Sequence, residues 1–546
     1  MLSSRFIAPA GFPSRVCGTL LLVAALAGCS RRESNVETGN AQQILHVAIS
    51  AEPRDLDPHL VTAYSDMQVV LAFFEGLTAV DEESSRAVPA CAESWTVSPD
   101  GLTWTFVIRD GLKWSDGAPL TAPVFRESLA RALAPTIASE YAYVLHGIKN
   151  AARYNAGEIP DFVGVGVKAP DDRTLVIELE QPSPALASIL ALPVAYPVPL
   201  HVIREHGGII DRGNRWTRPE NIVGNGPLRL TDWRPNQHVT GERNFHFREA
   251  STVALNGIAF YPYENAASQE AAFRSGQLHL TSELPLSKIA TYRAEQPQFL
   301  RIDPFLLTGF LRFNQTHPPF DDARVRRALG LAIDRQTLAA KVLTGGELPA
   351  GSLTPPGTGG YTATTSMDYD PEQARALLAA AGYPGGKGLP PIEVISPTRE
   401  INQRLIEAIQ QMWKRELRID LQIAMQEQRV WLDDETHLHY EVSNARWIGD
   451  YVEPYTFLEL FLSTSGNNNT GWANARYDDL ILRAGAELDE TRRFTLYQEA
   501  EALLLNEAVI APIYHGTQPF LMRSEVKGWP PALLGFHRYQ RVSLEP

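Results

Sequence analysis

Cysteine is scarce in this sequence: only Cys17, Cys29 and Cys91 occur among its 546 residues. Cys17 and Cys29 belong to an N-terminal segment that we expect to be processed, which leaves one unmodified thiol. A single thiol excludes an intramolecular disulfide, so Cys91 is expected to act as a small buried apolar side chain. With 44% hydrophobic residues the chain can bury an ordinary core, and its length indicates two or three domains.

Long hydrophobic runs are lacking, apart from one near the N-terminus. Residues 16–27 are apolar but too few to span a bilayer comfortably, and the sequence Leu-Ala-Gly-Cys ends the run at Cys29. This ending resembles the cleavage site of bacterial lipoproteins; the alternative is an ordinary signal peptide followed by an unmodified cysteine. We expect residues 1–28 to be a lipoprotein signal peptide, Cys29 to be lipidated, and residues 29–43 to be a flexible tether. The membrane anchor would then be the lipid alone.

Positive charge is in the minority. The 49 Lys and Arg residues face 63 Asp and Glu residues, which gives a formal net charge of −14, and no long basic run occurs. The arginines within residues 324–327 fit the solvated face of a helix better than a nucleic-acid surface, because no aromatic stacking platform accompanies them. We therefore expect no nucleic-acid partner.

The usual catalytic motifs are absent as well. The sequence contains no P-loop, no His-Glu-x-x-His and no Gly-x-Ser-x-Gly. His437 and His439 follow three acidic residues, but their spacing matches no known metal site, and a solvated polar loop is the better interpretation. The sequence thus predicts a binding protein rather than an enzyme, with no metal and no cofactor.

Among the features that are present, the segment 444–458 is the most informative. Residues 440–445 read as a short strand, and Asp450 follows beside Gly449 in an aromatic-rich stretch. The Glu453-Pro454 step disfavours helix at that point, so Asp450 is expected at a strand end where the backbone bends. Such a carboxylate can receive a cationic group; the alternative is an ordinary turn or capping aspartate.

Several motifs resemble one family, in order along the chain. Residues 44–59 form a strand followed by a short acidic segment, and Phe74-Glu75-Gly76-Leu77 comes next. Residues 92–117 read as a meander of strands with Asp-Gly turns. The segment from Trp447 to Pro454 is similar to the ligand loop of oligopeptide- and dipeptide-binding proteins. On these residues the chain resembles extracellular solute-binding protein family 5, over about residues 44–525.

This resemblance implies an α/β fold of the type II periplasmic-binding-protein kind, with three domains and a hinged ligand cleft. Its function would be that of a monomeric, periplasmic or envelope-anchored receptor, which hands short peptides to the permease and ATPase subunits of an ABC importer. Other ligands known in the family remain open: nickel chelates, haem, glutathione, murein peptides or oligosaccharides. The implied division is 44–75, 195–306 and 516–546 for domain I, 76–194 for domain II, and 307–515 for domain III.

The resemblance also implies a ligand site. Asp450 would meet the peptide amino group, helped by Tyr141 and the main chain of Ile448. Three positions at which relatives often bind peptide carboxylates with arginine or histidine hold Glu435, Asn444 and Asn402 here, so that anchor looks lost. Leu307 and Ile448 occupy positions that some relatives join by a disulfide. The remaining expected ligand-binding residues are Glu52, Gln428, Arg446, Trp447 and Tyr514.

Overall fold

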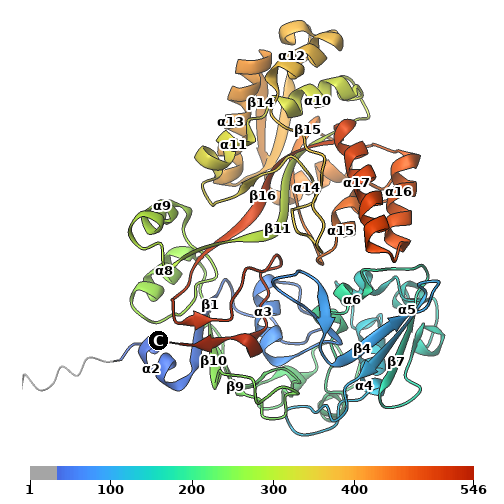
Figure 1. The fold of residues 1–546 in the computed structure, drawn as a ribbon, viewed down its shortest axis with the longest axis vertical. Helices are drawn as coiled ribbons and strands as arrows, with labels where there is room; N and C mark the ends of the chain where they lie inside the picture. Colours follow the sequence, from blue (N-terminus) through green and yellow to red (C-terminus); the bar gives the residue numbers. More distant parts are fainter. Residues whose placement is uncertain (1–32, 546) are drawn as a thin grey trace, which may run out of the picture.

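The computed structural model describes residues 33–545, which form two lobes (Figure 1). The lower lobe contains two four-stranded sheets, and the upper lobe contains one sheet of six strands. No helix within residues 33–545 is both long and apolar enough to cross a bilayer.

The first sheet of the lower lobe is mixed. Its order is β1-β10-β9-β8, with β1 parallel to β10 and the other pairs antiparallel. The strands are β1 (Ile44–Ile49), β8 (Leu228–Arg234), β9 (His238–Arg243) and β10 (Gly257–Pro262). The helices nearby are α3 (Tyr64–Phe73), α8 (Ala266–Arg274) and α9 (Leu286–Glu295).

The second sheet contains the first hairpin of the meander expected for residues 92–117, but residues 109–117 add no strand to it, and its other two strands come from residues 167–178. Its order is β4-β5-β7-β6, and all pairs are antiparallel. Along β5, Trp104, Phe106 and Ile108 are buried and alternate with less buried residues, as a two-faced strand requires. Both sheets of the lower lobe contribute to one continuous hydrophobic core. The elements are β4 (Ala92–Val97), β5 (Thr103–Ile108), β6 (Val167–Lys168), β7 (Thr174–Glu178) and α4 (Ala122–Ala132).

The sheet of the upper lobe has the order β12-β16-β11-β15-β13-β14. Separate apolar clusters pack helices such as α13 and α17 against it. The strands are β11 (Leu300–Phe313), β12 (Leu348–Pro349), β13 (Ile392–Pro397), β14 (Leu421–Gln426), β15 (Val442–Ile448) and β16 (Ile510–Leu521). The helices include α10 (Ala323–Leu331), α12 (Pro371–Ala380), α13 (Glu400–Leu417), α14 (Gln428–Thr436), α16 (Ala475–Ala486) and α17 (Glu490–Asn506).

Two long antiparallel strands, β11 and β16, run from the lower lobe into the upper lobe (Figure 1). Their lower ends pack with α8 and α9 around Phe273 and Leu521. Their register is interrupted between Pro304 and Thr308. The pair therefore connects the lobes and carries an irregularity between them.

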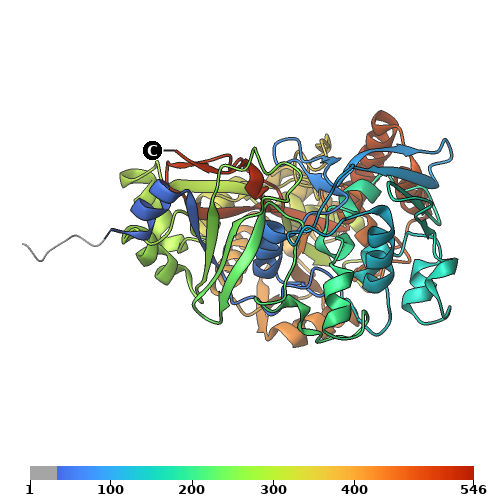
Figure 2. The ribbon, with the colours of Figure 1, turned by 90° about the horizontal axis from the view of Figure 1, so that it is seen from below.

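The tether expectation is wrong for the residues that the structure describes. Residues Asn35–Gln42 form helix α2, which begins with a capping box between Ser34 and Glu37. Val36 is buried, and its amide donates to the carbonyl of Gly276 at 2.9 Å. The C-terminal end of the chain lies beside α2 in both views (Figure 1 and Figure 2). Cys29 and the expected signal peptide lie outside the described residues.

The packing of α2 on β1 requires glycine at position 39. A Cβ placed on Gly39 would lie 2.5 Å from the carbonyl oxygen of Ile44. We expect Gly39→Val to displace α2, to lower the free energy of unfolding by about 1–3 kcal/mol, and to accelerate proteolysis within residues 33–43. Denaturant unfolding and limited proteolysis measure both effects. Gly466→Val is the control, because a side chain there meets no atom within 4 Å; equal behaviour of the two variants would contradict this packing.

Candidate functional site

Asp450 lies two residues beyond the end of β15, at the level of the gap between the lobes. The amide of Gly449 donates to the carbonyl of Leu306 at 2.9 Å, and the amide of Asp450 donates to Thr456 Oγ1 at 3.2 Å. These two bonds fix the bend. The strand itself extends to Ile448, further than the sequence predicted, because β15 pairs with β11 along its whole length.

The carboxylate of Asp450 has one hydrogen-bond partner among the described residues. Tyr143 donates its hydroxyl to Oδ2 at 3.0 Å. No Lys, Arg or His within residues 33–545 forms an ion pair with it, and burial raises the pKa of Asp450 above its usual value. An ordinary turn aspartate accepts from nearby backbone amides, as Asp171 does from Arg173 and Thr174, and Asp450 accepts from none.

The tyrosine that helps Asp450 differs from the one expected. The 3₁₀ helix η1 (Ala142–Leu145) places Tyr143 on the carboxylate, whereas Tyr141 precedes the helix and stacks on Tyr143 with ring centroids 5.9 Å apart. Tyr141 nevertheless lines a cavity with Asp450 and Ile448. The structure therefore keeps Tyr141 near the site and adds Tyr143, which the adjacent Tyr-Ala-Tyr sequence could have suggested.

Two cavities meet at Asp450, between the lobes. One, of about 300 Å³, has an apolar wall. The other, of about 360 Å³, is bordered by the lower-lobe segment 143–189 and by upper-lobe tyrosines, and contains the carboxylate of Glu459. Burial and the charge of Asp450 raise the pKa of Glu459 to about 7. The first cavity is lined by residues that include Val61, Tyr64, Met67, Leu192, Phe305, Leu534 and Phe536.

A third cavity, of about 240 Å³, lies in the upper lobe where β13 and β15 separate. These strands pair only at Val394 with Val442 and at Ile395 with Ser443. Beyond that point the space between them is open, and the cavity contains most of the residues expected from the sequence. They are Asn402, Gln428, Asn444, Arg446, Trp447 and Tyr514.

The arrangement of β15 makes the three cavities one extended site. Residues 444–447 line the upper-lobe cavity, and residues 448–450 line the cavities between the lobes. Tyr514 reaches the site because Gly309 opposite it on β11 has no side chain; a Cβ there would lie 2.3 Å from the tyrosine ring.

Glu435 occupies one of the expected anchor positions, but its carboxylate already has a cationic partner. It forms an ion pair with Arg312 on β11 at 3.3 Å, and the two side chains are only 4% and 6% exposed. The pair leaves Glu435 Oε1 and Arg312 Nε without hydrogen-bond partners. Desolvation raises the pKa of Glu435 above its usual value in spite of Arg312.

The structure does not bring Glu52 to these cavities. Glu52 accepts from the indole of Trp233 at 2.6 Å and from the amide of Asn236 at 3.0 Å, so its carboxylate stabilises a lower-lobe turn. Leu307 and Ile448, by contrast, lie opposite each other in the β11–β15 register. This is the position that a disulfide linking them would need, and two aliphatic residues occupy it here.

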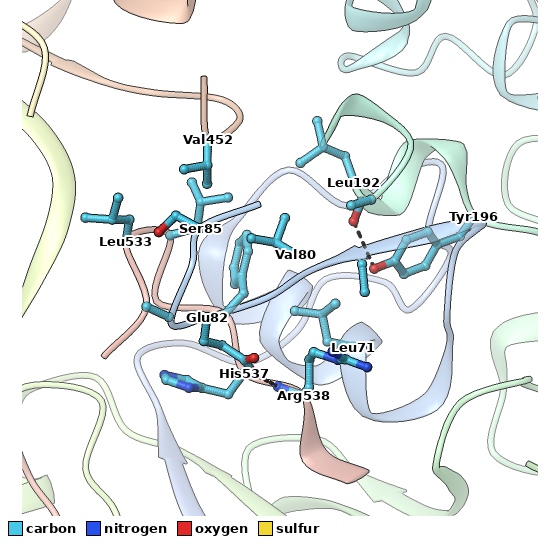
Figure 3. A pocket seen from close by; sticks show the side chains of 15 residues that line it. Leu71, Val80, Glu82, Ser85, Leu192, Tyr196, Val452, Leu533, His537 and Arg538 are labelled. Atoms are coloured by element: carbon cyan, nitrogen blue, oxygen red, sulfur yellow. Dashed lines mark hydrogen bonds between the residues drawn. The ribbon is translucent and has the colours of Figure 1, made fainter. Parts of the chain in front are cut away.

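A small cavity of about 50 Å³ lies where segments of both lobes converge (Figure 3). Val452, Leu533 and Val80 approach one another there, and the amide of Arg538 donates to Glu82 at 2.7 Å. This cavity is too small for a bound peptide and belongs to the packing between the lobes. His437 and His439 stack on each other, and no group of three or more His, Cys, Asp or Glu within residues 33–545 could hold a metal ion.

Comparison with known proteins identifies the family. The family model described as "Bacterial extracellular solute-binding proteins, family 5 Middle" matches residues 86–469 of this chain. The chain belongs to this family. It is 36% identical over 497 residues to YgiS of Escherichia coli, described as a probable deoxycholate-binding periplasmic protein, which covers 90% of this chain and 91% of that protein. It is 33% identical over 520 residues to the periplasmic oligopeptide-binding protein OppA of Salmonella typhimurium, covering 94% of each.

Solved structures show that this family 5 protein adopts the α/β fold of periplasmic peptide-binding proteins. The murein tripeptide-binding protein MppA, in a form described as unliganded and open, gives a TM-score of 0.85 at 32% identity, covering 92% of this chain and 97% of that chain. A second structure of MppA, from Escherichia coli, gives 0.72 at the same identity, covering 92% and 98%. At equal sequence identity, this chain therefore superposes better on the structure described as unliganded and open.

The buried Arg312–Glu435 pair provides a stability test that is independent of ligand. We expect Glu435→Leu to lower the free energy of unfolding of the upper lobe by about 3–5 kcal/mol, because it leaves the Arg312 charge buried without a partner. The double variant Arg312→Leu with Glu435→Leu should recover most of that loss. Denaturant unfolding of the parent, both single variants and the double variant gives the coupling; strictly additive losses would contradict the pair.

Proposed function

We propose that this protein is an extracytoplasmic receptor of an ABC importer and binds short peptides in extended form. The support is the family, the cavities between two lobes, and a site that combines main-chain groups with the carboxylate of Asp450. Its domains would be those expected from the sequence, except that domain I begins before β1 with helix α2, since α2 packs against β1. Binding without catalysis is the activity that these features support.

The observation that carries the proposal is the free edge of β15. On one side β15 is fully paired with β11; on the other it pairs with β13 only at Val442 and Ser443. The edge from Asn444 to Ile448 thus faces the cavities with main-chain donors and acceptors that no strand uses. An extended peptide can add to such an edge as a further strand, and main-chain bonding does not depend on the peptide's sequence.

Asp450 determines the direction in which a peptide would run along this edge. A peptide that runs antiparallel to β15 would begin beside Asp450 and extend toward Asn444. Its α-ammonium would meet a carboxylate that lacks any other cationic partner in the described chain. An ion pair that is also hydrogen-bonded and shielded from water is the strongest polar contact available to a small ligand. A sugar cannot make this contact, so the proposal favours a ligand with an amine.

The charge of Asp450 should decide the affinity. We expect Asp450→Asn to weaken binding of free-amine peptides by about 2–5 kcal/mol, or roughly 30-fold to several thousand-fold, because it leaves the ammonium desolvated without a counter-charge. Acetylating the peptide amine removes the same pair from the other side. The two changes together should therefore cost much less than their sum, as calorimetry on the four combinations would show.

Asp420→Asn is the matched control for this cycle. Asp420 is exposed, pairs with Lys414, and does not line the cavities described above, so its loss of charge should leave peptide affinity unchanged. If Asp450→Asn binds free-amine peptides as tightly as the parent, Asp450 has only a structural role and the peptide assignment fails.

A second ligand class follows from the apolar cavity beside Asp450. Its aromatic and aliphatic wall suits an amphipathic molecule, and one relative is named as probably binding deoxycholate. The carboxylate of Asp450 at the rim would repel the acid group of such a ligand. We therefore place deoxycholate second to an amine-bearing peptide, including a murein peptide, and competition between the two in one titration would rank them.

We also propose that the receptor is periplasmic and that lipidated Cys29 anchors it to the membrane. The Leu-Ala-Gly-Cys sequence after the apolar run supports this. Cys29→Ser should move the protein from the membrane fraction to the aqueous phase of a detergent partition, because the lipid would be its only anchor. Continued partition of the Ser variant into detergent would contradict the lipid anchor. The proposed partners are the permease and ATPase subunits, with the receptor acting as a monomer.

A further inference from the structure

Two guanidinium groups in the upper-lobe cavity have no counter-charge. Arg399 precedes α13, and Arg446 lies on β15, and both line the cavity. Within residues 33–545 neither side chain forms a hydrogen bond or an ion pair. The third arginine of the cavity, Arg312, is already neutralised by Glu435. The charged side chains that line the cavity are therefore three positive and one negative, in a chain whose overall charge is −14.

The two free arginines also lie close enough to disfavour each other. Burial and the charge of Arg399 lower the pKa of Arg446. Two like charges beside one cavity, whose single carboxylate is already paired with Arg312, destabilise the unliganded state and are relieved by an anion. Arginine is well suited to this role because its planar fork can bind both oxygens of a carboxylate.

The rest of the cavity supports a polar occupant. The indole Nε1 of Trp447 is a buried donor without an acceptor, and so is Nε of Arg312, whose side chain is 94% buried. Asn444 and Asn402 keep their amide oxygens free, because their Nδ2 atoms donate to Ser396 Oγ and to the Pro397 carbonyl at 3.0 Å each. The unsatisfied donors surround the same space as the arginines, and buried donors normally find a partner.

We infer that Arg399 and Arg446 form an anion subsite that binds the carboxylate of the same ligand whose amine Asp450 holds. This rests on the proposed function and adds a second anchor to it. The positions at which the family resemblance led us to look for cationic groups hold Glu435, Asn444 and Asn402. The guanidinium groups come instead from two other positions around the same cavity, one on each of the diverging segments.

The spacing of the two anchors fixes the ligand length. Arg446 and Asp450 are four residues apart in the chain, which is at most about 13 Å of extended chain and less where the backbone bends after Ile448. An added peptide strand has the same rise per residue. A tripeptide or tetrapeptide can thus reach both anchors with its terminal charges, whereas a dipeptide is too short and the carboxylate of a hexapeptide passes beyond Arg446.

Calorimetry on the full-length exported protein tests this with alanine peptides of two, three, four and six residues, each as free acid and as amide. We expect amidation to lower the affinity of the tri- and tetrapeptides by about 10- to 100-fold and that of the hexapeptide much less. In the variant carrying Arg399→Gln and Arg446→Gln, the acid and the amide should bind equally. Arg153→Gln is the control, since it removes one exposed positive charge of the lower lobe away from these cavities.

The outcomes separate this inference from the proposed function. If peptides bind and depend on Asp450 but amidation has no effect at any length, the subsite is wrong and the peptide receptor stands. If amidation weakens binding equally in the parent and in the double arginine variant, the carboxylate binds elsewhere and the subsite is again wrong. If no peptide binds but deoxycholate does, with a loss on Arg399→Gln and Arg446→Gln, the carboxylate subsite stands and the peptide assignment fails.

Discussion

The structure depends on one pair of strands, β11 and β16, which connects the lobes. Their upper part forms the centre of the six-stranded sheet, while their lower ends pack beneath α8 and α9. Between the two lies the register break at Pro304 to Thr308. Leu306, within this break, accepts from the amide of Gly449 and donates its own amide to the carbonyl of Leu533. The segment that carries Asp450 is thus bonded directly to the part of β11 that connects the lobes, so the position of Asp450 depends on that connection.

Local patterns were sufficient to predict much of this architecture. Alternation and an Asp-Gly turn predicted the hairpin of β4 and β5, and the strand before Asp450 was recognisable from its apolar residues. The aspartate itself could be singled out because it stands alone, beside a glycine and before Glu453-Pro454, where regular structure ends. Most of the expected upper-lobe residues were found around one cavity, because four of the six lie on β15 or α14.

What the sequence did not predict depends on contacts between distant segments. Glu52 looked like a ligand residue, but its partners Trp233 and Asn236 lie about 180 positions away in the chain and satisfy it within the lower lobe. Residues 35–42 looked polar enough to be unstructured, although the capping box at Ser34 was a local signal for helix. No feature of the sequence around Arg399 indicated that it would line the cavity. It enters the site only because β13 and β15 separate after Ile395, and a divergence of paired strands cannot be seen in either strand alone.

The division of tasks between the lobes follows from where the charges are. Arg446 and the free edge of β15 belong to the six-stranded sheet, and Asp450 follows that strand by two residues, so all three lie on the upper lobe. A ligand held by these groups would therefore contact a single lobe through its charges. The lower lobe contributes Tyr143, which already donates to Asp450, and the apolar wall around Phe536. Because a ligand shifts an equilibrium between two arrangements only by its differential affinity for them, any effect of a ligand on the lobe arrangement would depend on these lower-lobe contacts rather than on the charged groups of the upper lobe.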